Sequence, residues 1–373
     1  MDGNSYIGDV PHPGFYIREE LEAREWTQRD LAYILGTPEQ AVNMIISGKR
    51  GISPEMAKAL GDAFDVNPEL FINLQRAYDM SHARSPDPGV ARRAKLQSAY
   101  PVREMIKRGW LQDTDAAMLE AQMANFFEVK NAGDIPHMAF AAKKSHYDET
   151  PPTQLAWLFR VRQIAKAIAV PRYSEKALRD AVSILRNLLI DPEEARNVPR
   201  ILAECGVRFV VVEGLPNGKI DGVCFWLDKQ SPVIGLSLRL DRIDNFWFVL
   251  RHEIEHVLRK DGQDREIIDV DMQGADDASL PDEERIANAA AADFCVPEQE
   301  INLFIARKAP FFAERDVIGF ARRLNVHPGL VVGQIQKKTE RWDLLRRHLV
   351  KIRAFVLPGS IVDGWGVSAS VAV

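Results

Sequence analysis

Apolar residues recur at helical spacing through the first eighty residues of the chain and predict five short helices. The predicted helices cover residues 14–24, 27–35, 39–46, 53–64 and 68–78. Start and stop signals separate them: Thr27 is a typical N-cap, Gly36 and Gly48 end helices, and Ser53 precedes a proline suited to a first helical position. The pattern therefore predicts a compact five-helix domain over residues 1–80.

The next part of the chain divides into a linker and a helical stretch. Residues 81–95 are rich in Pro, Gly and Arg, a composition typical of linkers. Helical periodicity then dominates residues 96–197, and no spacing of polar residues there matches a catalytic site. We interpret residues 96–197 as a helical connector or dimerisation region.

From about residue 198 the pattern changes to strands and then returns to helices. β-rich runs at residues 207–213, 220–226 and 233–238 are separated by Gly, Pro and Asn. Helix-period segments follow at residues 245–259, 282–294, 297–305, 314–324 and 328–338, and the tail after Leu357 has no clear periodicity and receives no role. The sequence thus predicts a mainly α chain with an α+β C-terminal domain over residues 198–373, built on a small sheet.

Composition narrows the class of protein. Hydrophobic residues make up 46% and charged residues 27% of the 373 residues, which is ordinary for a globular protein. No run approaches the roughly 18 apolar residues that a membrane span needs, and the first residues do not resemble a secretory signal. The three scattered cysteines indicate a reducing compartment and not a disulfide framework. We therefore expect a cytoplasmic protein without a membrane partner.

The net charge of −5 gives no general indication of nucleic-acid binding. Residues 1–80 hold seven Lys/Arg against thirteen Asp/Glu, whereas residues 81–110 hold seven against two. A DNA-binding role for the first domain therefore requires that its basic residues lie on one face, or that the following segment contributes.

The helix predicted at residues 245–259 contains a His-Glu-x-x-His pattern. Residues four apart on a helix share a face, so His252 and His256 can direct their imidazoles at one point. Zinc accepts two neutral imidazoles readily, and Glu253 can then take a proton from the bound water. The alternative is a pair of exposed helix histidines without a metal.

A catalytic zinc needs a third protein ligand and one open position. The helix predicted at residues 282–294 offers Asp282, Glu283 and Glu284, and its run of alanines allows close approach to another helix. Acidic residues in a first turn also stabilise the helix dipole, a role that suits Asp282 and Glu283 better than Glu284. Asn288 lies one turn after Glu284 and is placed to hydrogen-bond a ligating imidazole.

These paired motifs resemble the ImmA/IrrE family of metallopeptidases. The similarity rests on residues 252–256, on Glu284-x-x-Ala287-Asn288, and on the apolar residues 294–297 that end in proline. The resemblance implies a zincin-like domain in which His252, His256 and Glu284 bind Zn²⁺ and Glu253 is the general base. It also implies cleavage of one specific regulatory protein.

Three further expectations concern the surroundings of this site. Glu255 stands where the family commonly has glycine, so its charge must point away from the sheet. A substrate peptide is expected to bind as an added strand along an edge strand at residues 233–238. His327 either stabilises the oxyanion or caps the helix that begins at Pro328, and the cap is the more ordinary role.

Within the first domain, residues 27–37 and 40–45 fit two helices joined by a glycine turn. Ala32 is small where the helices cross, and Gly36 can take a left-handed conformation. The residues expected to meet DNA are Glu39, Gln40 and Asn43 at the major groove, Gln28 at a phosphate or a base edge, and Lys49 and Arg50 at phosphates.

This segment resembles Xre-type regulators of the HigA-like antitoxin branch. The similarity is carried by Leu31-Ala32, Gly36, residues 47–53, Ala57 and Leu60. It implies a helix-turn-helix domain that binds double-stranded operator DNA as a homodimer. The same fold used only for protein contacts is the alternative.

Two hypotheses for the whole chain follow. In the first, the protein is a DNA-binding transcriptional regulator whose zinc peptidase domain cleaves a repressor or another regulatory partner. In the second, it is a HigA-like antitoxin and autorepressor, in which the zinc domain senses or binds a toxin with little proteolysis.

Overall fold

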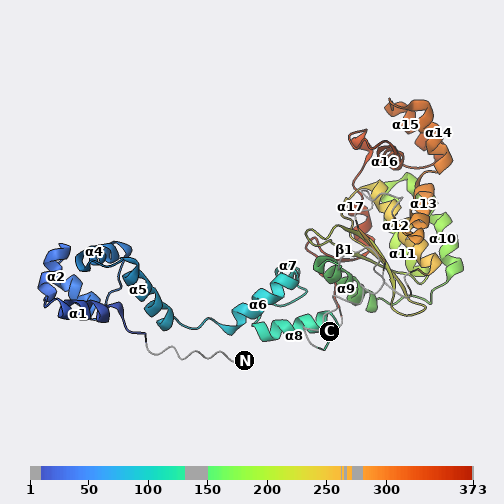
Figure 1. The fold of residues 1–373 in the computed structure, drawn as a ribbon. Coiled ribbons are helices and arrows are strands. Elements are labelled where there is room, and N and C mark those ends of the chain that lie inside the picture. Colours follow the sequence, from blue (N-terminus) through green and yellow to red (C-terminus); the bar gives the residue numbers. More distant parts are fainter. Residues whose placement is uncertain (1–9, 131–149, 262, 264–266, 271–279, 372–373) are drawn as a thin grey trace. The chain divides into compact units, whose positions relative to one another are not determined.

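The computed structural model describes residues 10–130, 150–261, 263, 267–270 and 280–371. Its contacts divide the chain into two compact units, Met1–Asp87 and Pro88–Val373. Among the described residues, no helix combines the length and the apolarity that a membrane crossing requires. The expected fold class, mainly α with an α+β C-terminal region, is confirmed (Figure 1).

The first unit contains the five predicted helices. They are α1 (Pro13–Ala23), α2 (Gln28–Leu35), α3 (Glu39–Ile46), α4 (Pro54–Phe64) and α5 (Glu69–His82). Thr27 and Asp30 form a capping box at the start of α2, and Gly36 ends that helix in the left-handed conformation. The apolar stripes meet in one core that includes Leu31, Val42 and Phe71.

The second unit begins earlier than the sequence indicates. Residues 81–95, expected to be a linker, include the last residues of α5 and the start of α6 (Pro88–Ala99). The remaining helices before the sheet are α7 (Val102–Lys107), α8 (Ala116–Phe126), α9 (Pro152–Lys166), α10 (Glu175–Asn187) and α11 (Val198–Glu204), with 3-10 turns η3 (Leu188–Ile190) and η4 (Pro192–Asn197).

A five-stranded sheet forms the centre of the second unit, in the order β4-β2-β3-β1-β5. Its strands are β1 (Arg208–Val212), β2 (Ile220–Trp226), β3 (Pro232–Leu236), β4 (Ile267–Val270) and β5 (Ile361–Asp363). The first three correspond to predicted strands, whereas β4 and β5 do not. β3 pairs in parallel with β1 and antiparallel with β2, so the expectation that it is an edge strand is wrong.

The two faces of the sheet pack against different helices. Val210, Val223 and Phe225 lie in one core with residues of α6 to α9, and Val211, Cys224 and Ile234 lie in the other with α10 to α13. Alternation along β1 explains this division, because successive strand residues point to opposite faces. The described residues between 96 and 197 thus contribute to both layers that cover the sheet, and a connector or dimerisation role for this region stays a prediction.

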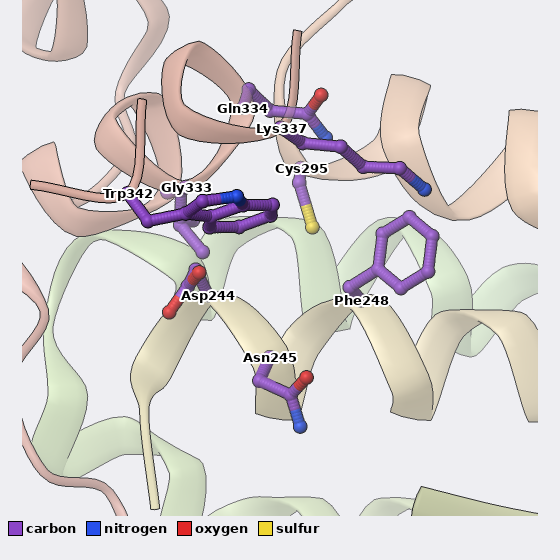
Figure 2. Close-up of a pocket in the computed structure, with 9 residues that line it drawn as sticks. Asp244, Asn245, Phe248, Cys295, Gly333, Gln334, Lys337 and Trp342 are labelled. Atoms are coloured by element: carbon purple, nitrogen blue, oxygen red, sulfur yellow. The ribbon is translucent and has the colours of Figure 1, made fainter. Parts of the chain in front are cut away.

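The remaining helices follow β3 in the sequence. They are α12 (Ile243–Arg259), α13 (Asp282–Cys295), α14 (Glu298–Lys308), α15 (Glu314–Leu324), α16 (Pro328–Thr339) and α17 (Arg353–Val356), with 3-10 turns η6 (Arg346–His348) and η7 (Leu357–Gly359). Residues of α12, α13 and α16, together with Trp342, line a hollow (Figure 2).

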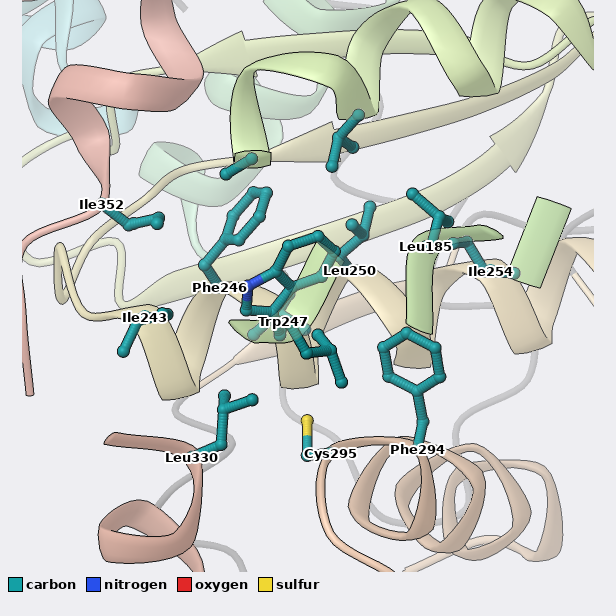
Figure 3. Packing of buried hydrophobic residues seen from close by; sticks show 14 of the residues in the cluster. Leu185, Ile243, Phe246, Trp247, Leu250, Ile254, Phe294, Cys295, Leu330 and Ile352 are labelled. Carbon is teal, nitrogen blue, oxygen red and sulfur yellow. The ribbon is translucent and has the colours of Figure 1, made fainter. Parts of the chain in front are cut away.

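Helix α12 is fixed by its apolar face. Trp247 is fully buried between Phe246 and Phe294, and Leu250 and Ile254 continue the same core (Figure 3). Burial of side chains of this size contributes about 1.5–3 kcal/mol each relative to exposure. The helix is therefore held rigidly, which matters because its next turns carry the His-Glu-x-x-His pattern.

Candidate metal centre and helix-turn-helix surface

Two imidazoles of α12 and one carboxylate of α13 meet at a single point. One ligand atom from each of His252, His256 and Glu284 lies within 4.8 Å of the other two. The Nε2 atoms of His252 and His256 are 2.9 Å apart, and the Glu284 oxygens lie 3.3 Å from the first and 3.6 Å from the second. Both imidazoles are fully buried. The structure thus brings the three predicted ligands together.

The approach of α13 depends on its alanines. Ala287 and Ala291 are completely buried, and α13 packs closely on α12. Asp282, by contrast, lies at the exposed start of the helix and pairs with Arg285. Burial raises the pKa of the Glu284 carboxyl, but hydrogen bonds and charge from His252 and His256 outweigh it and hold that pKa below its ordinary range.

Asp261 is a site residue that the sequence analysis missed. Lys260 ends α12 in the left-handed conformation, and the backbone N–H of Asp261 donates to the carbonyl of His256. This turn brings Oδ2 of Asp261 to 3.1 Å from Nδ1 of His256. Because a carboxylate only accepts, the ring donates from Nδ1, and in the neutral ring Nε2 is then the unprotonated nitrogen that a metal ion can bind.

Glu253 is fully buried against strand β2. A Cβ atom added to Gly222 would lie 2.0 Å from Oε1 of Glu253 and 2.8 Å from a methyl group of Val249. Gly222 also lies at a register irregularity between β2 and β4. A side chain at this position would displace the Glu253 carboxylate from where it lies, and the sequence analysis did not identify this close contact.

Of three remaining expectations, the cap by His327 is seen in the structure, and those for Glu255 and Asn288 stay predictions. Glu255 pairs with Arg251 at 2.7 Å, so its charge is compensated on its own helix. His327 caps α16, because its Nδ1 accepts from the N–H of Gly329 at 3.0 Å. Asn288 has a buried Oδ1 for which the described residues supply no hydrogen-bond donor, and its predicted bond to an imidazole stays a prediction.

In the first unit, the predicted DNA-contacting residues gather around α2 and α3. Glu39, Gln40, Asn43, Lys49 and Arg50 are exposed, and Gln28 is partly buried. The amide of Asn43 donates to Oε1 of Gln28 at 3.2 Å, which fixes both side chains. The carboxylate of Glu39 pairs with Arg29 at 3.0 Å, so its charge is partly neutralised.

Comparison with known families agrees with both parts of this description. Residues 17–71 match the family model described as helix-turn-helix, and residues 206–332 match a peptidase family model described as IrrE N-terminal-like domain. The chain carries both domains. The residues matched by the IrrE-like model include the candidate metal ligands His252, His256 and Glu284, and the two resemblances drawn from the motifs are confirmed.

Each of two individual relatives matches about a fifth of this chain. Virulence-associated protein A' of Dichelobacter nodosus is 40% identical over 72 residues, which are 19% of this chain. The chain spans 63% of the length of that protein. The HTH-type transcriptional regulator YddM of Escherichia coli (strain K12) is 29% identical over 77 residues, which are 21% of this chain and 82% of that protein.

Two of the similar solved structures also cover about a fifth of this chain. One is an addiction module antidote protein of the HigA family from Coxiella burnetii, with 35% identity over 20% of this chain and 80% of that chain, and a TM-score of 0.19. The other is PA4674 of Pseudomonas aeruginosa in complex with its operator DNA, with 37% identity over 19% of this chain and 76% of that chain, and a TM-score of 0.19.

Proposed function

We propose that this protein is a transcriptional regulator that binds operator DNA through its first unit and cleaves a regulatory protein with a zinc-dependent peptidase site in its second. The observation that carries the proposal is the convergence of His252, His256 and Glu284 beside the buried Glu253 within an IrrE-like domain. We accordingly propose that the protein acts in the cytoplasm, where an operator and its repressor are found.

The donor set fits zinc. Two imidazole nitrogens and one carboxylate are the ligands of many catalytic zinc sites, which keep a fourth position for water or substrate. Asp261 orients one of the imidazoles, as outer partners of zinc ligands generally do. When bound, zinc lowers the pKa of its water toward about 7 and polarises a carbonyl group.

The roles of the chain's own residues follow from this arrangement. His252, His256 and Glu284 would hold the ion, and Glu253 would accept a proton from the attacking water and deliver it to the leaving amine nitrogen. The peptide would add to the sheet at its β4 edge. Two observations support this edge: β4 is an outer strand of the described sheet, and it pairs with β2, whose Gly222 lies against Glu253.

Recognition of DNA is assigned to α3. Gln40 and Asn43 are exposed on this helix and suit adenine edges, with Gln28 and Glu39 beside them, while Lys49 and Arg50 suit phosphates. A homodimer is proposed because helix-turn-helix domains usually bind two half-sites.

The test compares the wild-type protein with Glu253→Gln, both loaded with zinc, in incubations with candidate repressor and toxin proteins. We expect one zinc per chain in both proteins and a defined cleavage fragment only with the wild type. Equal fragments with both proteins would show that Glu253 is not the base. Zinc binding without any fragment would instead support the antitoxin hypothesis, in which the zinc domain binds its partner.

A further inference from the structure

The hollow between α12 and α16 lies one helical turn before the metal centre. Asp244 and Phe248 of α12 form one side, Lys337 of α16 forms the other, and the sulfur of Cys295 points between them (Figure 2). Leu330 of α16 also lines the hollow. Its volume is about 480 Å³ including the open mouth.

The hollow and the metal centre share one face of α12. Phe248 precedes His252 by four residues, and four-residue spacing places side chains on one face. The ring of Phe248 stacks on the imidazole of His252 with 6.4 Å between centroids. An extended peptide advances about 3.3 Å per residue. A peptide held at the metal centre can therefore place a neighbouring side chain in the hollow.

The chemistry of the walls favours an apolar occupant. Phe248, Leu330 and Trp342 contribute apolar surface. Burial raises the pKa of Cys295 to about 12, so its thiol stays neutral. The carboxylate of Asp244 is held by Arg242 at 3.0 and 2.6 Å and offers little to a second cation.

A positive charge lies at the end of the hollow nearest the metal centre. The Nζ atom of Lys337 is 5.2 Å from the centroid of the Phe248 ring. A basic side chain entering at this end would meet a like charge in a partly desolvated place, which is costly. An aliphatic or aromatic side chain meets no such cost.

We propose that this hollow is the specificity pocket for the substrate residue next to the scissile bond, and that it accepts apolar side chains and rejects Lys and Arg. The inference rests on the proposed peptidase function, because it assumes that the peptide is held at the metal centre. Lys337 and Trp342 are then specificity-determining residues.

The test measures binding of three hydroxamates to the zinc-loaded full chain by titration calorimetry. Acetohydroxamate reports on the metal alone, 4-methylpentanohydroxamate adds an apolar side chain, and 6-aminohexanohydroxamate adds a basic one. We expect the apolar probe to bind tighter than acetohydroxamate by about tenfold or more, the discrimination that a hydrophobic pocket provides. The basic probe should show no gain.

Two variants and one control locate the effect. Trp342→Ala should abolish the gain from the apolar probe, and Lys337→Glu should tighten the basic probe by about fivefold. Lys351→Glu, an exposed lysine elsewhere in the same unit, should change neither. Equal affinity for acetohydroxamate and the apolar probe in the wild type would overturn the pocket while leaving the metal centre intact. Failure of acetohydroxamate itself to bind would overturn the metal centre, and with it the pocket's role.

Discussion

The carboxylate of Asp261 lies 3.1 Å from Nδ1 of His256, on the side of the ring opposite to the metal centre. Replacing Asp261 by Asn removes the charge that holds this ring, and we expect zinc affinity to fall by about 10–100-fold. Competition with a chromophoric chelator measures the affinity directly.

Glu255→Gln is the matched control for this change. It also removes one carboxylate near the end of α12, but Glu255 pairs with Arg251 and not with an imidazole. Its effect on zinc affinity should be small. If the Asp261 and Glu255 variants bind zinc equally well, Asp261 does not orient His256.

The C-terminal tail is held by a buried ion pair. Asp363 is almost completely buried, accepts from Nε of Arg160 at 2.9 Å and from the indole of Trp110 at 2.8 Å. Asp363→Ala leaves the buried guanidinium of Arg160 without its carboxylate, which should lower the free energy of unfolding by about 3–5 kcal/mol. Urea titration of the full chain measures the loss in the second unit.

An exposed ion pair provides the comparison. Asp343 pairs with Arg341 at 3.3 Å, and both side chains are largely accessible. Asp343→Ala should therefore cost less than about 1 kcal/mol. A similar small loss for Asp363→Ala would mean that the tail contributes little to the fold.

Local signals explain why most helices could be predicted from the sequence. The capping box at Thr27, the left-handed Gly36 and the alanines of α13 act within one or two helical turns. The sequence of the helix and its neighbours is therefore enough to predict it. The three candidate metal ligands could also be predicted from the sequence, because His252 and His256 have a fixed spacing on one helix and Glu284 lies in the first turn of a helix suited to close approach.

Non-local pairing explains what the sequence did not predict. Strand β5 has three residues and forms by parallel pairing with Val210 to Val212 of β1, which lie more than a hundred residues away in sequence. β4 likewise depends on β2. Asp261 and Gly222 matter only through contacts with His256 and Glu253, and no periodicity marks such contacts.

The cap of α16 predicts a pH dependence. Burial lowers the pKa of His327 from 6.5, His348 lowers it further, and Asp191 opposes the shift. The folded state therefore favours the neutral ring, whose Nδ1 accepts from Gly329. This contribution is complete above pH 6.5 and is lost as the pH falls through the lowered folded-state pKa.

His327→Asn keeps an acceptor at the N-cap but does not titrate. We expect the wild type to lose more unfolding free energy than this variant when the pH falls from about 7.5 to about 5.5, on the acid side of an ordinary histidine pKa. Urea titrations of the metal-free chain at both pH values measure the difference. Identical losses would contradict a titrating cap.

The helix-turn-helix surface predicts two kinds of DNA effect. Asn43 is exposed on α3 and fixed by Gln28 at 3.2 Å, so Asn43→Ala should weaken binding to the preferred sequence by about 1–3 kcal/mol while leaving other DNA unaffected. Lys49→Ala should weaken binding to all duplexes and reduce the salt-dependence slope by about one. Duplexes selected from a random pool by the full chain, and a scrambled duplex, serve as probes in salt-series titrations. Equal weakening on both duplexes by Asn43→Ala would exclude base recognition by this residue.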